Sequence, residues 1–292
     1  MPRGNKHKMT FLAAGLVAGI FVAGLGGVLA HKVTMIKNKP RRYEAKLPAH
    51  NKEGVAVFAA SSLDRVFEDG ETLLKPSFTK DAAISLARNE YESFQIVVSS
   101  KDRLLEGISL KISDLVNDQA GATIAQKNIT WRVVGYVPTI KPYYPVKYVG
   151  RWPDPLMPPR KTDIDAGTVQ PFWVTVYAPK ETAAGLYKGT ALVTADGVDP
   201  QEIPIQVQVY NFTLPVEVSL KTAFDFYGHE TFKRYPQKDN ELKEAYQARL
   251  DDLNNKYIIA MLKYRINPIL NVDPTSDEEL SRVDRYRPLG LN

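Results

Sequence analysis

Short apolar runs with a period of two fill the chain from residue 54 to residue 218. The alternation is clearest where every second residue from Ile203 to Val209 is a β-branched aliphatic. A period of two is typical of a strand with one buried face. Turn residues such as Asp-Gly separate the runs, and no long helical pattern intervenes. We therefore expect an antiparallel β-sandwich over residues 54–218. The predicted strands are residues 55–59, 83–86, 93–98, 108–112, 130–137, 172–177, 189–194 and 203–210.

The pattern changes after residue 218. Residues 219–227 and 266–272 are expected as strands, and the stretch 239–262 between them as a helix. Its apolar residues recur at steps of three and four, from Leu242 through Leu250 and Tyr257 to Leu262. Asp239 or Asn240 is the predicted N-cap of this helix.

A second helix is predicted to begin at Ser276, which precedes an acidic first turn. The order strand, helix, strand, helix calls for a parallel sheet covered by helices. A complete (β/α)8 barrel needs roughly 200 to 250 residues. We therefore interpret residues 219–292 as the truncated start of such a barrel.

The first residues have the form of an export signal. Residues 9–30 are uncharged and follow a basic start. About 20 apolar residues cross a bilayer, whereas a cleavable signal usually has an apolar region of about 7 to 15. Residues 1–31 are therefore a signal anchor or a signal peptide, and residues 32–53 a basic juxtamembrane linker. Three basic side chains precede the apolar segment and five follow it closely, which alone favours a cytoplasmic C-terminal side.

The charge distribution argues against a nucleic-acid partner. The net charge is +5, but eight of the 38 Lys and Arg lie in the first 42 residues, which leaves 30 against 33 Asp and Glu. The globular part is slightly acidic, so its net charge gives no electrostatic support for binding a phosphate backbone. The chain has no cysteine, and its four histidines are scattered. We expect no metal site and no cofactor, because Walker and dinucleotide motifs are also missing from the sequence.

Five motifs then occur in order: Arg88 to Gln95 (RNEYESFQ), Trp152 to Leu156 (WPDPL), Gln170 to Val174 (QPFWV), Ala184 to Gly189 (AGLYKG) and Phe212 to Pro215 (FTLP). Together they resemble the N-terminal sandwich of glycoside hydrolase family 123 and of related uncharacterised proteins that share its barrel. The resemblance implies a β-sandwich followed by a TIM-type barrel that acts on glycans containing β-linked N-acetylgalactosamine. It also implies export, so we expect the globular part on the extracytoplasmic side, either membrane-anchored through residues 9–30 or secreted.

The resemblance implies a substrate-assisted reaction. An Asp polarises the acetamido group of the sugar, while an adjacent Glu protonates the leaving oxygen. In the family this pair follows a later barrel strand, beyond Asn292. The only Asp-Glu dipeptide here is Asp277-Glu278, which is typical of a helix N-terminus. No catalytic residue is assigned, and the chain alone is expected to be inactive.

Several side chains are candidates for substrate binding. Asp225, Tyr227 and His229 follow the first predicted barrel strand, and Asp273 follows the second. Substrate-contacting groups lie at such strand ends. Each residue also has a structural interpretation: a solvated loop histidine for His229, packing for Tyr227, and a turn or helix cap for Asp273.

Trp152 is the other candidate. With Tyr143, Tyr144 and Tyr148 it forms an aromatic group that suits sugar stacking. The alternative is that these Pro-flanked aromatics hold a long loop against the sandwich.

Three classes of function remain open. The first is the N-terminal portion of a glycoside hydrolase-like protein acting on N-acetylhexosamine-containing glycans. The second is a non-catalytic carbohydrate-binding module. The third is an envelope interaction module that uses the open barrel remnant as an interface. The sequence does not indicate an oligomeric state.

Overall fold

The computed structural model describes residues 46–291 apart from 74, 147, 271 and 274. The predicted signal segment 1–31 and most of the linker 32–53 lie outside these residues. Within the described part of the chain, no helix is long and apolar enough to cross a membrane. The strands are β1 (Val55–Ser61), β2 (Ala82–Arg88), β3 (Glu90–Ser100), β4 (Leu105–Ile112), β5 (Leu115–Asn117), β6 (Ala122–Ile124), β7 (Ile129–Pro138), β8 (Arg151–Met157), β9 (Thr162–Ile164), β10 (Val169–Ala178), β11 (Gly185–Ala195), β12 (Val198–Thr213), β13 (Phe224–Asp225) and β14 (Pro268–Ile269). The helices are α2 (Thr231–Arg234), α3 (Lys243–Lys263) and α4 (Asp277–Asp284), with short 3₁₀ turns η1 (Gln126–Asn128), η2 (Gly228–Glu230) and η3 (Arg287–Leu289).

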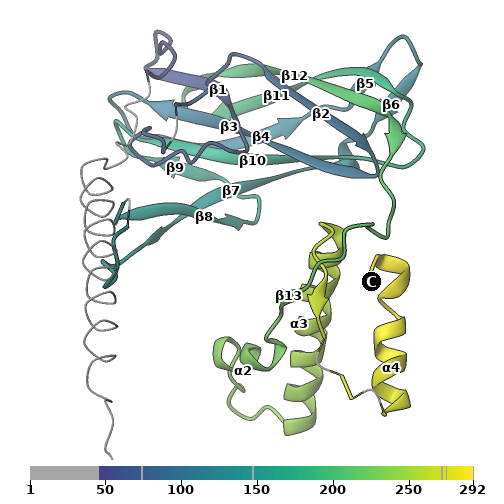
Figure 1. Cartoon of the computed structure of the whole chain (residues 1–292). Coiled ribbons are helices and arrows are strands. Elements are labelled where there is room, and N and C mark those ends of the chain that lie inside the picture. Colours follow the sequence, from purple (N-terminus) through teal and green to yellow (C-terminus); the bar gives the residue numbers. More distant parts are fainter. Residues whose placement is uncertain (1–45, 74, 147, 271, 274, 292) are drawn as a thin grey trace, which may run out of the picture.

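Two sheets form the sandwich seen in the upper part of Figure 1. One has five strands in the order β1-β3-β10-β7-β8; the other has seven, with β2-β12-β11-β4-β9 as its main path and β5 and β6 at its side. The mainly β, antiparallel character predicted from the sequence is confirmed. One pairing departs from it, because β2 runs parallel to β12. Neither strand's own pattern shows which direction its partner takes.

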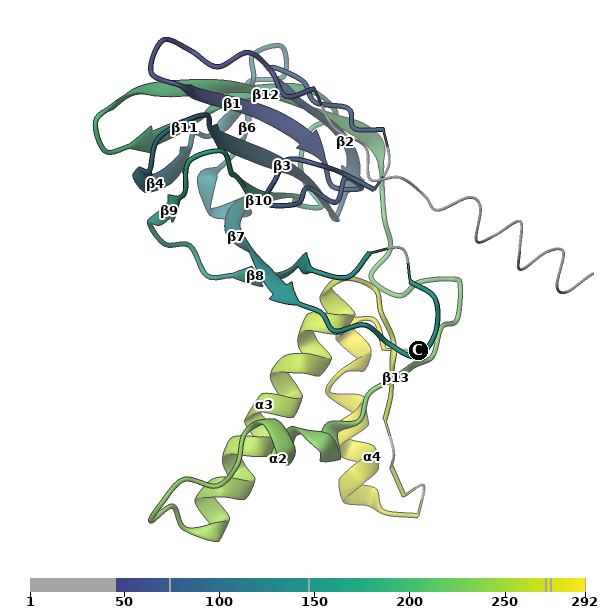
Figure 2. The same cartoon turned by 90° about the vertical axis from the view of Figure 1, so that its left-hand side faces the viewer.

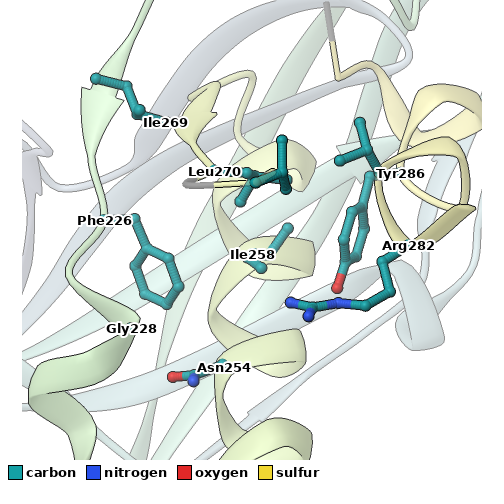
Figure 3. Close-up of a pocket in the computed structure, with 10 residues that line it drawn as sticks. Phe226, Gly228, Asn254, Ile258, Ile269, Leu270, Arg282 and Tyr286 are labelled. Atoms are coloured by element: carbon teal, nitrogen blue, oxygen red, sulfur yellow. The ribbon is translucent and has the colours of Figure 1, made fainter. Parts of the chain in front are cut away.

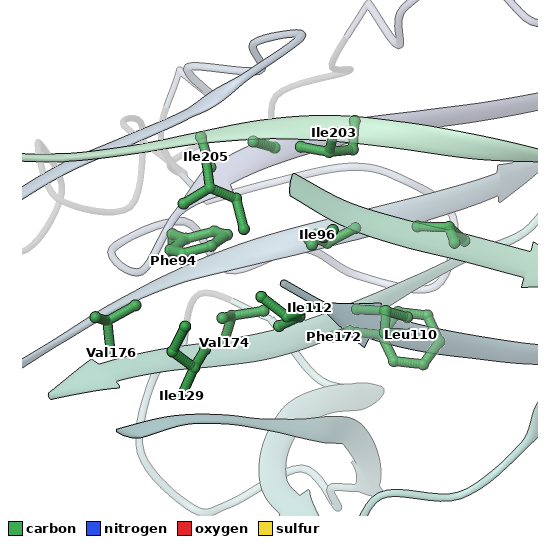
Figure 4. Close-up of a cluster of buried hydrophobic side chains, with 14 of the residues drawn as sticks. Phe94, Ile96, Leu110, Ile112, Ile129, Phe172, Val174, Val176, Ile203 and Ile205 are labelled. Atoms are coloured by element: carbon green, nitrogen blue, oxygen red, sulfur yellow. The ribbon is translucent and has the colours of Figure 1, made fainter. Parts of the chain in front are cut away.

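The core lies between the two sheets. The alternating residues of β12 are buried: Ile203 and Ile205 are 3% and 1% exposed, and Val207 and Val209 are fully buried. Side chains of the other sheet, including Phe94, Ile96, Phe172 and Val174, face them (Figure 4). Each such side chain contributes about 1.5 to 3 kcal/mol by leaving water. The period of two thus predicts the face that holds the sheets together.

All eight predicted strands are present, and four more were not predicted. Three of these, β5, β6 and β9, have only three residues each. The fourth, β8, contains Pro153 and Pro155, which argue against a strand. It lies at the edge of its sheet, where proline does not remove a needed hydrogen bond.

A single residue, Asn89, joins β2 of one sheet to β3 of the other. Its backbone is left-handed with φ 60°, a conformation that asparagine tolerates better than most residues. The Asn89 side chain donates from Nδ2 to the Leu214 carbonyl at 2.8 Å and accepts at Oδ1 from the Tyr177 hydroxyl at 3.0 Å. The Glu90 carboxylate accepts from the Ala87 amide at 2.6 Å. The Arg-Asn-Glu motif therefore builds a corner of the sandwich.

The C-terminal segment is a strand, helix, strand, helix unit. β13 and β14 pair in parallel, with Phe224 opposite Pro268 and Asp225 opposite Ile269, and α3 lies between them in the chain. The predicted parallel pairing is confirmed. The predicted strands 219–227 and 266–272 shorten to two residues each, because a two-stranded sheet offers few partners for their backbone groups.

The start of α3 corrects two predictions. The helix begins at Lys243, and its N-cap residue Leu242 makes no side-chain cap bond. Asn240 has a left-handed backbone with φ 63°, so it belongs to the preceding turn and neither it nor Asp239 is the cap. Of the predicted apolar stripe only Leu250, Ile258 and Leu262 are buried, whereas Leu242 is 73% and Tyr257 41% exposed.

The start of α4 agrees with the sequence. Ser276 is the N-cap and its hydroxyl accepts from the Glu279 amide at 3.3 Å. Asp277 and Glu278 lie in the first helical turn, where carboxylates stabilise the helix dipole.

One end of the sandwich receives the C-terminal unit (Figures 1 and 2). Arg265, which follows α3, donates from Nη2 to the Asn89 carbonyl at 2.6 Å and to the Pro215 carbonyl at 3.4 Å. The Tyr264 ring lies 5.4 Å from the Tyr91 ring, and the Lys263 ammonium lies 4.6 Å from the Tyr91 ring centroid. The corner residue Asn89 thus also serves as the docking point of α3.

Candidate functional site

The carboxyl edge of the β13–β14 pair brings two predicted site residues together. Asp225 ends β13, and the Tyr227 hydroxyl donates to its Oδ2 at 3.1 Å. Both side chains are exposed to solvent. The hydrogen bond to the carboxylate and its negative charge raise the pKa of the Tyr227 phenol, so the phenol remains protonated at neutral pH. The pair presents a carboxylate and a neutral hydroxyl to solvent.

Asp273 follows β14 at the same edge but is engaged locally. Its Oδ1 accepts from the Thr275 amide at 2.8 Å and from the Thr275 hydroxyl at 2.7 Å, and these bonds lower the pKa of Asp273. Its own amide donates to the Glu279 carboxylate at 2.6 Å. Asp273 therefore shapes the turn into α4. His229 lies in η2, and its side chain is outside the described part of the chain.

A cavity of about 230 Å³ adjoins this edge (Figure 3). That volume is below the usual range of ligand pockets, roughly 300 to 1,000 Å³. It lies among the strands, α3 and α4. Its lining consists of Phe226, Gly228, Asn254, Ile258, Ile269, Leu270, Val272, Arg282, Val283 and Tyr286.

The polar groups of this cavity come from the two helices. The Asn254 Oδ1 on α3 is buried and has no hydrogen-bond partner among the described residues. Arg282 on α4 extends its guanidinium into the same space (Figure 3). Gly228 allows the loop to approach α3, since a Cβ there would lie 3.2 Å from Asn254 Nδ2. Sequence reasoning missed Asn254 and Arg282, because both occupy polar positions of ordinary helices.

Trp152 lies away from this edge, in β8 on the sandwich. Its ring is 5.5 Å from Phe67 and 5.8 Å from Tyr148. Tyr143 and Tyr144 form a separate exposed pair, with ring centroids 5.2 Å apart. The predicted aromatic group therefore divides into a packed part and an exposed part.

No group of three or more histidine, aspartate or glutamate side chains that could hold a metal ion is found in the residues the structure describes.

Comparison with known proteins identifies a family that the chain resembles. Residues 74–195 match the glycoside hydrolase 123 N-terminal domain. No curated protein matches the chain in sequence. Among solved structures, a family 123 glycoside hydrolase from Clostridium perfringens, described in terms of glycolipid glycan hydrolysis, superposes with a TM-score of 0.56 at 17% identity. The match covers 73% of this chain but only 36% of that hydrolase, so the chain spans about a third of its length.

Other solved structures are more distant. A FixG-related protein from Vibrio parahaemolyticus gives a TM-score of 0.27 at 9% identity, covering 53% of this chain and 96% of that one. A PapD-like domain of human CEP192 gives 0.29 at 10% identity, covering 59% and 98%. At these scores neither bears on function. The resemblance to glycoside hydrolase family 123 is confirmed by the domain that residues 74–195 match and by the fold shared with a solved family member.

Proposed function

We propose that this chain is the N-terminal portion of a glycoside hydrolase-like protein that acts on N-acetylhexosamine-containing glycans. The observation that carries the proposal is the parallel β13–β14 pair with Asp225 and Tyr227 at its carboxyl edge. In (β/α) barrels, this edge is where side chains contact substrate. The similarity to a family 123 hydrolase described for glycolipid glycans supports a glycan as the ligand.

Asp225 and Tyr227 suit binding of sugar hydroxyl groups. The Tyr227 hydroxyl donates to Oδ2 of Asp225, and the other carboxylate oxygen, Oδ1, is an acceptor that suits a ligand hydroxyl or amide donor. The neighbouring cavity of about 230 Å³ is large enough to admit a substituent such as an acetamido group, with the Arg282 guanidinium as donor to its carbonyl.

The proposal assigns binding and not bond cleavage to these residues. Asp277 and Glu278 stabilise the first turn of α4, so they do not form a pair across a glycosidic bond. Under this proposal, neither the acid nor the acetamido-polarising carboxylate is assigned to a residue of this chain. The chain alone is expected to bind N-acetylhexosamines without hydrolysing them.

The proposal also includes an extracytoplasmic location for residues 54–292, anchored through residues 9–30 or released after cleavage. Determining the N-terminus of the protein isolated from its host distinguishes the two forms.

Calorimetric titration of the whole chain with an oligosaccharide ending in β-linked N-acetylgalactosamine tests the binding role. Asp225→Asn and Tyr227→Phe should each weaken binding by about tenfold or more, because the first removes the charge of the acceptor and the second removes the hydroxyl that bonds to it. Asp118→Asn and Tyr143→Phe, at exposed positions elsewhere, are the matched controls. Unchanged affinity in both site variants would refute the assignment.

A further inference from the structure

We propose that the sandwich carries a second sugar site, distinct from the β13–β14 edge, which binds a neutral glycan against Tyr148 with Glu68 and Arg151 as its polar contacts. The site is a cavity of about 410 Å³ at the loop end of the β7–β8 hairpin. This volume lies within the usual range for ligand pockets. Its lining consists of Phe67, Glu68, Asp69, Tyr148, Gly150, Arg151, Gly167 and Thr168.

Tyr148 forms the aromatic wall. Phe67, which is 1% exposed, meets the Tyr148 ring edge to face with the centroids 4.8 Å apart. Trp152 supports Tyr148 from another direction at 5.8 Å. Tyr148 itself is half-buried and lines the cavity. A held aromatic ring with an exposed part offers the apolar surface on which the C–H face of a sugar packs.

This arrangement changes the role of Trp152. Trp152 was predicted to stack on a sugar, but it does not line the cavity. It packs against Phe67 and Tyr148 instead, so it is a positioning residue for Tyr148.

The loop backbone sets the position of Tyr148. Thr139 closes the loop, because its amide donates to the Gly150 carbonyl at 2.8 Å and its hydroxyl does so at 2.9 Å. A Cβ on Gly150 would lie 2.1 Å from the Tyr148 hydroxyl. The glycine therefore permits the tyrosine to lie over the backbone, and alanine there would displace the ring.

A fixed ion pair supplies the polar contacts. Arg151 Nε lies 2.7 Å from Glu68 Oε2, and the Glu68 carbonyl accepts from the Val169 amide at 2.9 Å. The ion pair uses one carboxylate oxygen and one guanidinium N–H. The second Glu68 carboxylate oxygen can accept a hydrogen bond, and the terminal N–H groups of Arg151 can donate one. A sugar hydroxyl both donates and accepts, so it matches both groups.

The charge of the lining selects the class of sugar. Arg151 is the only cation among the described lining residues, and Glu68 at 2.7 Å balances its charge. Among these residues an anionic sugar or a phosphate would find no unbalanced cation, so its binding is disfavoured. The site is therefore assigned to neutral sugars.

The test uses the whole chain on an array of neutral, sialylated and sulfated glycans, followed by calorimetry with the best ligand. We expect neutral glycans to bind and acidic ones to fail. Tyr148→Ala and Gly150→Ala should weaken binding by about tenfold or more. Glu68→Gln keeps the side-chain size, so it should weaken binding without unfolding the hairpin. Tyr143→Ala, a fully exposed tyrosine of the same loop, is the matched control and should bind as the original chain does.

Asp225→Asn separates this site from the β13–β14 edge. If Asp225→Asn leaves binding of the array ligand intact and Tyr148→Ala removes it, the second site is supported. If Asp225→Asn alone removes binding, the glycan binds at the barrel edge and the second site is refuted. Preferential binding of acidic glycans, binding of no neutral glycan, or equal losses in Tyr143→Ala and Tyr148→Ala also overturn it. Circular dichroism of each variant confirms that the sandwich is folded.

Discussion

Substituting Asn89 tests how the corner of the sandwich is held. Asn89→Ala removes two side-chain hydrogen bonds, the one donated to Leu214 and the one accepted from Tyr177. It also places a residue with a Cβ and no local hydrogen bond at φ 60°. Asn89→Gly removes the same two bonds but tolerates that backbone conformation. The two variants therefore separate side-chain bonding from backbone preference.

The expected magnitudes follow from these contacts. Each hydrogen bond contributes about 0.5 to 1.5 kcal/mol, so their loss costs about 1 to 3 kcal/mol in both variants. A left-handed backbone costs a non-glycine residue about 1 to 2 kcal/mol. Asn89→Ala should therefore be less stable than Asn89→Gly by about 1 kcal/mol or more. For a protein of this size, 1 kcal/mol corresponds to a change in Tm of about 2 to 4 °C.

Urea unfolding followed by tryptophan fluorescence measures both variants, because Trp131 and Trp173 lie in the five-stranded sheet. Tyr177→Phe is the control, since it removes one of the two bonds and leaves Asn89 in place. It should cost about 1 kcal/mol. Equal stability of the alanine and glycine variants would refute the backbone argument, and an unchanged Tyr177→Phe would refute the hydrogen-bond argument.

Three further predictions concern the core and the C-terminal unit. Phe172→Ala, which empties a fully buried position, should cost about 3 to 5 kcal/mol in urea unfolding; a loss below 1 kcal/mol would contradict the packing described. The Arg249 guanidinium, through its hydrogen bond, lowers the pKa of Glu241 to about 2, so the stability of this pair is present above about pH 4.3 and is lost as the pH falls through about 2. In Glu241→Gln, the helicity of α3 measured by NMR should change less over that pH window than in the original chain. The same pH dependence in both proteins would contradict the pairing. Ser276→Ala should destabilise α4 by about 1 kcal/mol in hydrogen exchange, whereas unchanged protection would show that its cap bond is unimportant.

The sequence predicts the sandwich well because local pattern and burial coincide there. The alternation from Ile203 to Val209 both favours a strand and defines its buried face. Prediction fails where local pattern and tertiary position do not coincide. Pro153 and Pro155 argue against a strand, and β8 tolerates them only because it lies at the edge of its sheet. The parallel pairing of β2 with β12 depends on strands far apart in the chain, which no local pattern reports.

The candidate site is predictable to the same extent. Asp225 and Tyr227 are two residues apart at the end of a strand, so their contact follows from local geometry. Arg282 meets Asn254 at one cavity only because α4 packs beside α3, which is a tertiary result. The sugar site proposed on the sandwich likewise needs Glu68 and Arg151, which are joined by folding and not by sequence.

The parallel β2–β12 pairing has a consequence for synthesis of the chain. Ala82 pairs with Ile205, so β2 emerges from the ribosome well before its partner in the seven-stranded sheet. At about 5 to 20 residues per second, the interval between these residues lasts roughly 6 to 25 s. Within the described residues, β2 is hydrogen-bonded to β12 alone in its sheet, so its edge stays open during that time. A nascent chain that stalls before β12 therefore leaves β2 open to aggregation.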